Sequence, residues 1–252
     1  MISGLQSGVA NVANGLMALK KLLYEQGTLS ADQIAKALVS NFEREEDEIL
    51  RHRLLSVPKY GNDVDEVDQI AWQIMDDYLQ MVDPFRTTRS GRGPIGCRYA
   101  KPSANPPARL LVFLPVCATP DGRKSGEPIA EGVSPVHGTD TCGPTAVMRS
   151  VAKLQTSKML AQLLNLRLSP SMLDTEMGEK KFIQLLRGFQ RLKGWHVQFN
   201  MISTETLLDA QKHPENYTDL IVRVAGYSAL FVTLDKATQD DIIARTVHII
   251  SK

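Results

Sequence analysis

One glycine in an apolar segment raises the first chemical question of this sequence. Gly226 lies within "DLIVRVAGYSALFVTL", Asp219 to Leu234, where most neighbours are apolar. Glycine loses more chain entropy on ordering than any other residue and fills no space in a core. Because glycine adopts turn conformations freely, the residue taken by itself predicts a tight turn after a strand.

The thiols and imidazoles of the chain do not form a recognisable site. Cys97, Cys117 and Cys142 contain no CxxC pair, and their odd number argues against a disulfide framework. The five histidines show neither HxxxH nor HExxH spacing. We therefore predict no metal site.

Three polar stretches are interpreted as ordinary structural features and not as binding sites. "GTDTCGPT" from Gly138 has the G-x4-G spacing of a phosphate-binding loop, but Pro144 stands where the lysine belongs, so we predict no cofactor-binding site. "TPDGRKSGEP" from Thr119 predicts a surface turn. In "YGNDVDEVD" from Tyr60, we expect Asn62 or Asp63 to cap a helix whose first turn holds the acids.

Composition narrows the class of protein. The chain has 252 residues, a formal net charge of +1 and 43% hydrophobic residues. This charge gives no electrostatic footprint for nucleic acid. The longest apolar run, which begins at Leu110, is too short to cross a membrane, and the N-terminus does not resemble a secretory signal. We expect a cytoplasmic protein that binds neither nucleic acid nor membranes.

Helices and strands alternate in the expected elements. Residues 86–144 are rich in glycine, proline and polar residues and predict long loops. Helical periodicity in the first predicted helix places Val9, Val12, Leu16, Leu19, Leu22 and Leu23 on one stripe. Helices are expected over 8–27, 29–43, 63–82, 144–155, 180–194, 203–214 and 236–250, and strands over 195–203 and 220–224. The fold class is therefore α/β.

Together these segments resemble the C-terminal part of a glycyl radical enzyme. The resemblance is carried by "GVANVANGLMALKKLLYE", "PKYGNDVDEVD", "TPDGRKSGEPIAEGVSPVHGTDTCGPTAVMRSVAKL" and "RVAGYSA". The family includes pyruvate formate-lyase and the glycerol, diol and choline lyases, and the wording of "VRVAGYSA" is similar to the glycerol and choline branch. It implies the C-terminal half of an α/β barrel, with a partial barrel segment over 1–125 and a glycyl radical domain over 126–252.

The resemblance also implies the chemistry of Gly226. In the family, a radical S-adenosylmethionine activase removes a hydrogen atom from the glycine α-carbon, so the site needs no bound cofactor. The residues that would support the radical loop are Arg223, Val224, Ala225, Tyr227 and Ser228. The apolar flanks expected to exclude water are Val222, Val224, Ala225, Leu230 and Phe231.

The family also needs a cysteine that passes the radical to substrate. In the lyase branch it lies in a Gly-Cys-Val-Glu-type motif, whereas Cys97 lies in "GCRYA", so we expect this thiol to be absent from the chain. The expected function is the radical-bearing portion of an anaerobic lyase or dehydratase, incomplete by itself. Its expected partners are the activase, an N-terminal half or a full-length family member, and a small-molecule substrate. The alternatives are a stand-alone radical carrier of a split enzyme, a formate C-acetyltransferase-type enzyme, and a non-functional truncated product.

Overall fold

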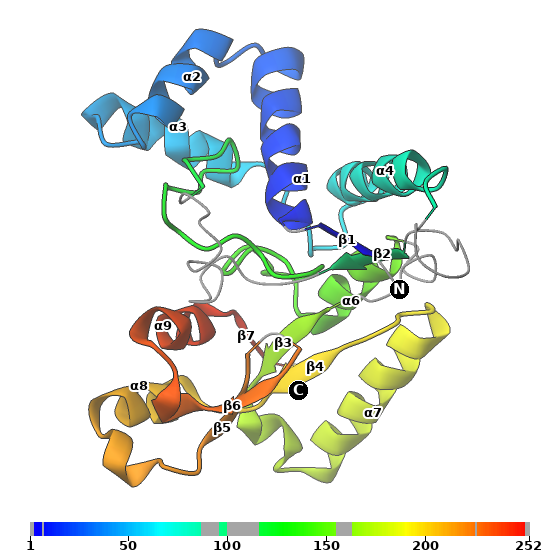
Figure 1. Cartoon of the computed structure of the whole chain (residues 1–252), viewed down its shortest axis with the longest axis vertical. Coiled ribbons are helices and arrows are strands. Elements are labelled where there is room, and N and C mark those ends of the chain that lie inside the picture. Colours follow the sequence, from blue (N-terminus) through cyan, green and yellow to red (C-terminus); the bar gives the residue numbers. More distant parts are fainter. Residues whose placement is uncertain are drawn as a thin grey trace.

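The N-terminal part of the computed structural model is helical (Figure 1). The structure describes residues 3–6, 8–86, 96–99, 116–154, 163–224 and 226–249. Its first helices are α1 (Val9–Ala18), which continues as a π-helix (Leu19–Glu25), α2 (Ala31–Val39), α3 (Glu45–Ser56) and α4 (Asp65–Val82). The Ser30 side chain caps α2 in a capping box with Gln33.

The buried face of α1 differs from the predicted stripe. Val12 and Leu16 are 48% and 43% exposed, and the helix instead buries small residues such as Ala10, Ala13 and Ala18. α4 packs against α1. Because the distance between two packed helices depends on the side chains at the contact, alanines allow a close approach. Helical spacing finds the helix, and Val9 and Leu22 of the predicted stripe are buried, but the prediction is wrong for Val12 and Leu16.

One helix in this region was not predicted, and one predicted helix cap is wrong. α3 lies between predicted helices, and its buried face consists of Asp47, Leu50 and Leu54, too few apolar residues for a clear stripe. α4 has Val64 at its N-cap position and no side-chain cap. Asn62 instead accepts hydrogen bonds from the amides of Thr141 and Cys142, at 2.8 and 3.0 Å. It thus fixes the loop that leads into the next helix.

Helices and strands alternate in the C-terminal part. Its elements are α6 (Pro144–Ala152), β3 (Asn165–Leu168), a 3-10 turn (Pro170–Leu173), α7 (Glu176–Arg191), β4 (Gln198–Asn200), α8 (Thr204–Lys212), a 3-10 turn (Pro214–Asn216), β5 (Ile221–Arg223), β6 (Ser228–Leu230), a 3-10 turn (Phe231–Thr233), α9 (Lys236–Ala244) and β7 (Val247–His248). Two further strands lie earlier in the chain: β1 (Ser3–Gln6) precedes α1, and β2 (Gly96–Tyr99) follows α4. The α/β class is confirmed. The helix predicted over 236–250 is wrong beyond Ala244, because the chain there forms β7.

The strands form three small sheets. β4, β3 and β7 make a parallel sheet in that order, β1 pairs in parallel with β2, and β5 pairs antiparallel with β6. The pairing of β5 with β6 has Arg223 opposite Ser228, so the chain reverses direction between these two residues. This reversal places Gly226 at the tip of a hairpin.

Two apolar clusters support this arrangement. The larger one joins α1, α3, α4, α6 and α7, and the smaller one consists of Leu207, Ala210, Val222, Val224, Phe231 and Ile242 beneath the β5–β6 hairpin. Figure 1 shows α1 to α4 in the upper half, α7 to α9 with the hairpin in the lower half, and residues 116–143 between them. No helix in these described ranges combines the length and the apolar character needed to span a membrane.

Candidate functional site

Gly226 lies at the tip of the Gly226 hairpin, defined here as Ile221–Leu230. The amide of Val224 donates to the carbonyl of Tyr227 at 2.9 Å and closes the turn. Gly226 has φ = 79°, in the left-handed region that glycine enters without steric cost. Among the described residues other than its chain neighbours, no atom lies within 4 Å of where a Cβ would stand. Backbone conformation, and not crowding, therefore favours glycine here.

The apolar flanks anchor the hairpin but leave its tip open. Val222, Val224 and Phe231 are at most 1% exposed and belong to the smaller apolar cluster. Leu230 is 38% exposed, and Gly226, Tyr227 and Ser228 are exposed. Leu230 faces outward among the described residues, so its expected role in excluding water stays a prediction. Ala225, the remaining expected flank, lies outside the described residues.

Arg223 connects the two strands of the hairpin to the sheet below. Its Nη1 donates to Ser228 Oγ at 2.9 Å, and its Nε and Nη2 donate to Gln198 Oε1 at 3.1 and 2.6 Å. Its amide donates to Asn200 Oδ1 at 2.8 Å, and its carbonyl accepts from Asn200 Nδ2 at 2.7 Å. The structure thus brings Arg223 and Ser228, two expected support residues, into direct contact.

The same region contains buried polar residues that our reading of the sequence did not select. Gln198 and Asn200 are the buried positions of β4, whereas Phe199 between them is only half-buried. Gln198 Nε2 donates to Asn165 Oδ1, and Asn165 Nδ2 donates to the carbonyl of Val224 at 3.3 Å. The polar residues at alternate positions of "QFN" were a usable signal, since alternate strand residues share a face.

Arg245 was also missed by the sequence analysis. Its guanidinium lies below the hairpin and donates to the carbonyls of Arg223 and Val224 at 3.2 and 2.8 Å. It also pairs with Glu131 and Asp241 at 3.2 and 3.1 Å. The sequence signal was a basic residue four positions after an acid in an expected helix, which ordinarily indicates only a solvent-exposed pair.

Two groups of acids and histidine approach metal-ligand distances. The ligand atoms of Glu131, His137 and Asp241 lie within 4.8 Å of one another, and so do those of Asp63, Asp65 and Asp68. Each group already has a basic partner. Arg245 pairs with Glu131 and Asp241 of the first group, and Lys153 contacts all three acids of the second at 2.6 to 2.8 Å. The absence of a metal site stays a prediction.

Lys153 and Asp68 illustrate the electrostatics of that second group. Burial acts to lower the pKa of Lys153, but the hydrogen bonds and charges of the three carboxylates together raise it above its ordinary value. Burial raises the pKa of Asp68, although Lys153 opposes this shift. The ammonium and carboxylates therefore stabilise one another as a charged cluster that joins α4 to α6.

One histidine lies close to the hairpin. Burial, and to a smaller extent the positive charge of Arg223, lowers the pKa of His196. Within the described ranges, its Nδ1 is buried and has no hydrogen-bond partner. A neutral imidazole is therefore favoured at neutral pH next to the Arg223 guanidinium.

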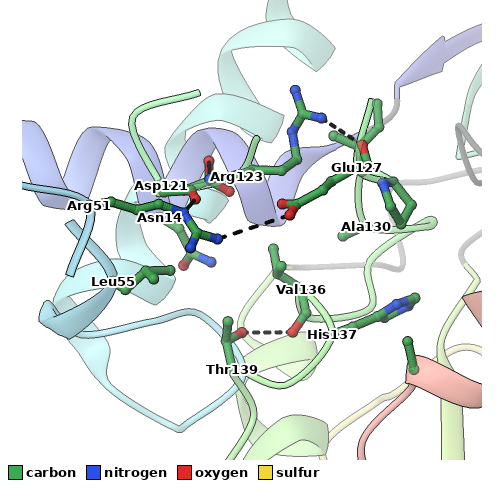
Figure 2. A pocket seen from close by; sticks show the side chains of 14 residues that line it. Asn14, Arg51, Leu55, Asp121, Arg123, Glu127, Ala130, Val136, His137 and Thr139 are labelled. Atoms are coloured by element: carbon green, nitrogen blue, oxygen red, sulfur yellow. Dashed lines mark hydrogen bonds and ion pairs between the residues drawn. The ribbon is translucent and has the colours of Figure 1, made fainter. Parts of the chain in front are cut away.

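A cavity of about 240 Å³ separates α1 and α3 from residues 121–139. Figure 2 shows Arg51 directed across it toward Glu127, with His137 and Thr139 on the opposite side.

The predicted turn at Thr119 is confirmed, since the amide of Gly122 donates to the carbonyl of Thr119 at 3.0 Å. It is not a surface turn, because Asp121 and Arg123 are 4% and 5% exposed.

Lys59, which lies near this turn, also has a displaced pKa. Burial lowers the pKa of Lys59 to about 8, against the opposing charge of Asp121. Its Nζ donates to the carbonyls of Leu54 and Asp121 at 2.6 and 3.4 Å. Displaced pKa values are common at functional sites, but they also arise in structural networks. These two carbonyl contacts place Lys59 in the second category, as a link between the end of α3 and the buried turn.

The cysteines contribute little to the hairpin. Cys117 and Cys142 are exposed free thiols. Cys97 lies in β2. Two free thiols thus lie at the surface of the part of the chain that the structure describes.

Two protein-family models match the chain. The glycine radical model matches residues 129–232, and the pyruvate formate lyase-like model matches residues 2–97. The first range contains the Gly226 hairpin, and the second contains α1 to α4.

Relatives are similar over nearly all of this chain. It is 48% identical to a probable dehydratase of Escherichia coli, YbiW, over 99% of this chain and 31% of that protein. It is 40% identical to an isethionate sulfite-lyase of Nitratidesulfovibrio vulgaris over 96% of this chain and 28% of that protein. The chain therefore spans about a third of the length of these relatives.

Solved structures show the same likeness. The glycerol-bound B12-independent glycerol dehydratase from Clostridium butyricum superposes with a TM-score of 0.85 at 41% identity, over 98% of this chain and 30% of that one. A 1,2-propanediol-dehydrating protein of Roseburia inulinivorans gives a TM-score of 0.88 at 41% identity, over 98% of this chain and 32% of that one. The expected fold, part of a larger α/β barrel, is confirmed by this likeness.

Proposed function

Since the chain belongs to the glycyl radical enzymes, we propose that Gly226 stores a backbone radical for a lyase or dehydratase. The observation that carries the proposal is a glycine with φ = 79° at an exposed hairpin tip, within the segment that the glycine radical model matches. Hydrogen-atom loss leaves one hydrogen on Cα and flattens that carbon. Because glycine carries no side chain and tolerates unusual backbone angles, the hairpin accommodates this change.

The proposed reaction begins with an activase. A radical S-adenosylmethionine enzyme takes one hydrogen atom from Gly226 Cα, and the unpaired electron delocalises over the adjoining amide nitrogen and carbonyl. Exposure of Gly226, Tyr227 and Ser228 supports access by such a partner. The role of the surrounding residues is to position and protect the radical.

In the second proposed step, Gly226 recovers a hydrogen atom from a cysteine thiol, and the resulting thiyl radical attacks the substrate. We propose that this thiol is none of the three in the chain. Exposure of Cys117 and Cys142 supports this, since a reactive thiyl radical needs a site closed to water and oxidants. The relatives are about three times as long, which leaves ample chain to supply both thiol and substrate contacts.

The proposed reaction class is elimination of a small group from a small organic molecule. Three relatives support it by name: the probable dehydratase, the isethionate sulfite-lyase and a trans-4-hydroxy-L-proline dehydratase of Clostridioides difficile. A radical carrier that serves a separate N-terminal polypeptide is the second candidate. It is favoured by the exposed apolar residues Ile221 and Leu230 on the hairpin, which such a partner would cover.

Electron paramagnetic resonance tests the proposal directly. The chain is co-expressed with a family activase without oxygen, once with ordinary glycine and once with α-deuterated glycine. We expect a doublet from the single remaining α-hydrogen, which collapses in the deuterated sample. A signal that persists unchanged in Gly226→Ala protein would contradict the assignment to Gly226.

A further inference from the structure

The carbonyls that precede Gly226 converge on one buried side chain. The Arg245 side chain is 5% exposed and lies between the hairpin and residues 116–143. Nη1 donates to the carbonyl of Arg223 at 3.2 Å, and Nη2 donates to the carbonyl of Val224 at 2.8 Å. These are the two peptide groups that lead directly into the Gly226 turn.

The same guanidinium is held by acids from two other elements. Nη2 lies 3.2 Å from Glu131 Oε2 and 3.1 Å from Asp241 Oδ2. Glu131 is 1% exposed and comes from the segment between the two halves of the molecule. A buried carboxylate of this kind strongly stabilises a paired cation and is costly when left alone.

Asn165 completes the connection from the strand side. Its Nδ2 donates to Glu131 Oε1 and also to the carbonyl of Val224, at 3.3 Å in the latter case. The Val224 carbonyl therefore accepts two hydrogen bonds, and both donors are fixed by Glu131. A shift of Glu131 would move both donors together.

We propose that Arg245, held by Glu131 and assisted by Asn165, is a positioning latch that sets the orientation of the Gly226 turn. The latch makes the placement of the radical glycine depend on residues 127–135, which are remote in sequence. Its importance for the radical depends on the proposed function, but its effect on the hairpin does not. Arginine suits this role because its planar fork contacts several acceptors in fixed directions, which a lysine ammonium cannot reproduce.

The chain contains a matched control for this proposal. Arg167 is also buried, at 1% exposure, and donates to the carbonyls of Ile202 and Ile243 at 2.9 to 3.3 Å. These carbonyls lie outside the hairpin. Arg245→Lys and Arg167→Lys therefore remove comparable buried hydrogen bonds from the same half of the molecule, and only the first touches the Gly226 turn.

Amide hydrogen exchange of the full chain is the primary test, and it needs no activase. We expect Arg245→Lys to accelerate exchange over residues 221–230 by about tenfold, because charge-assisted hydrogen bonds are lost locally. Arg167→Lys should leave these amides unchanged relative to those of α8. Equal exchange in wild type and Arg245→Lys, or equal acceleration by Arg167→Lys, would overturn the latch.

A second variant and a spectroscopic measurement complete the test. If Arg245→Lys fails to fold, Glu131→Gln removes the charge that holds the guanidinium, and the same local acceleration is expected. After activation, the latch predicts that the variant radical has an altered spectral line shape, whereas Arg167→Lys keeps that of wild type. Absence of any signal in wild type would contradict the proposed function, while the exchange experiment would still decide the latch.

Discussion

At the level of single residues, two separate properties favour glycine at position 226. The space around the missing Cβ is open within the described residues, whereas φ = 79° disfavours any residue with a side chain. The positive φ and the proposed radical chemistry are thus two independent reasons for glycine at this position. Variants can separate them, because other glycines of the chain share the conformation without the proposed chemistry.

We expect Gly226→Ala to fold, to lose about 1 kcal/mol of unfolding free energy and to lose the radical completely. Gly126→Ala is the control, since Gly126 has φ = 81° and equally open surroundings. It should show a similar loss of stability and a full radical signal. Urea unfolding and electron paramagnetic resonance measure the two effects, and loss of the signal in both variants would refute a specific role for Gly226.

His196 predicts a dependence of stability on pH. Burial and Arg223 lower its pKa in the folded chain below the ordinary value of 6.5. The unfolded state then takes up a proton first as the pH falls, so this contribution to stability is present above about pH 6.5 and decreases below it.

His196→Gln should therefore lose less unfolding free energy than wild type between about pH 8 and about pH 5. His52→Gln is the control, because the His52 side chain is 71% exposed. Thermal or urea unfolding at several pH values provides the measurement. Identical pH dependence of wild type and His196→Gln would show that His196 contributes nothing.

At the level of secondary-structure elements, the inner face of the hairpin is buried against helices and its outer face is exposed. Phe231, Val222 and Val224 pack against α8 and α9, while the outer residues Ile221 and Leu230 remain 61% and 38% exposed. The smaller apolar cluster therefore anchors the hairpin on its inner side. It places the tip at the surface without enclosing it.

Truncation of the anchor should be far more costly than truncation of the outer strand. Phe231→Ala removes a fully buried ring and should lower the unfolding free energy by about 3 kcal/mol. Leu230→Ala should cost less than about 1 kcal/mol, because the side chain is partly solvated. If urea unfolding gave similar losses of unfolding free energy for the two variants, the distinction between a buried inner face and an exposed outer face would be contradicted.

Helices with local sequence signals were predicted, whereas a helix that depends on tertiary contacts was not. Capping residues and helical spacing found α2, α6 and α8 because their signals are local. α3 was missed because its buried face includes Asp47, whose cost of burial is offset by Arg44 and Ser40. Such compensation depends on tertiary contacts, which no periodicity reveals.

The residues of the candidate site also divide into those that the sequence predicted and those that it did not. Gly226 and its immediate neighbours were predicted because a contiguous motif carries the resemblance. Glu131, Asn165 and Arg245 come from three separate segments, and only the folded chain brings them to the carbonyls of β5. Polar residues that act through backbone carbonyls leave no spacing pattern in a sequence.

At the scale of the whole molecule, the chain matches a portion of much larger glycyl radical enzymes. It covers about 30% of two solved dehydratase structures, with TM-scores of 0.85 and 0.88. We propose a division into residues 1–125, a partial barrel segment, and 126–252, a glycyl radical domain. The gap between the two matched family models, from residue 97 to residue 129, supports this boundary.

Backbone cleavage by oxygen tests the central claim most directly. The chain is activated without oxygen by a family activase, exposed to air and analysed by mass spectrometry beside a full-length relative. Oxygen attacks a glycyl radical at its own backbone, so the account predicts a cut at Gly226 that releases a peptide beginning near Tyr227. An intact chain beside a cleaved relative would contradict the account and favour a chain that does not carry the radical.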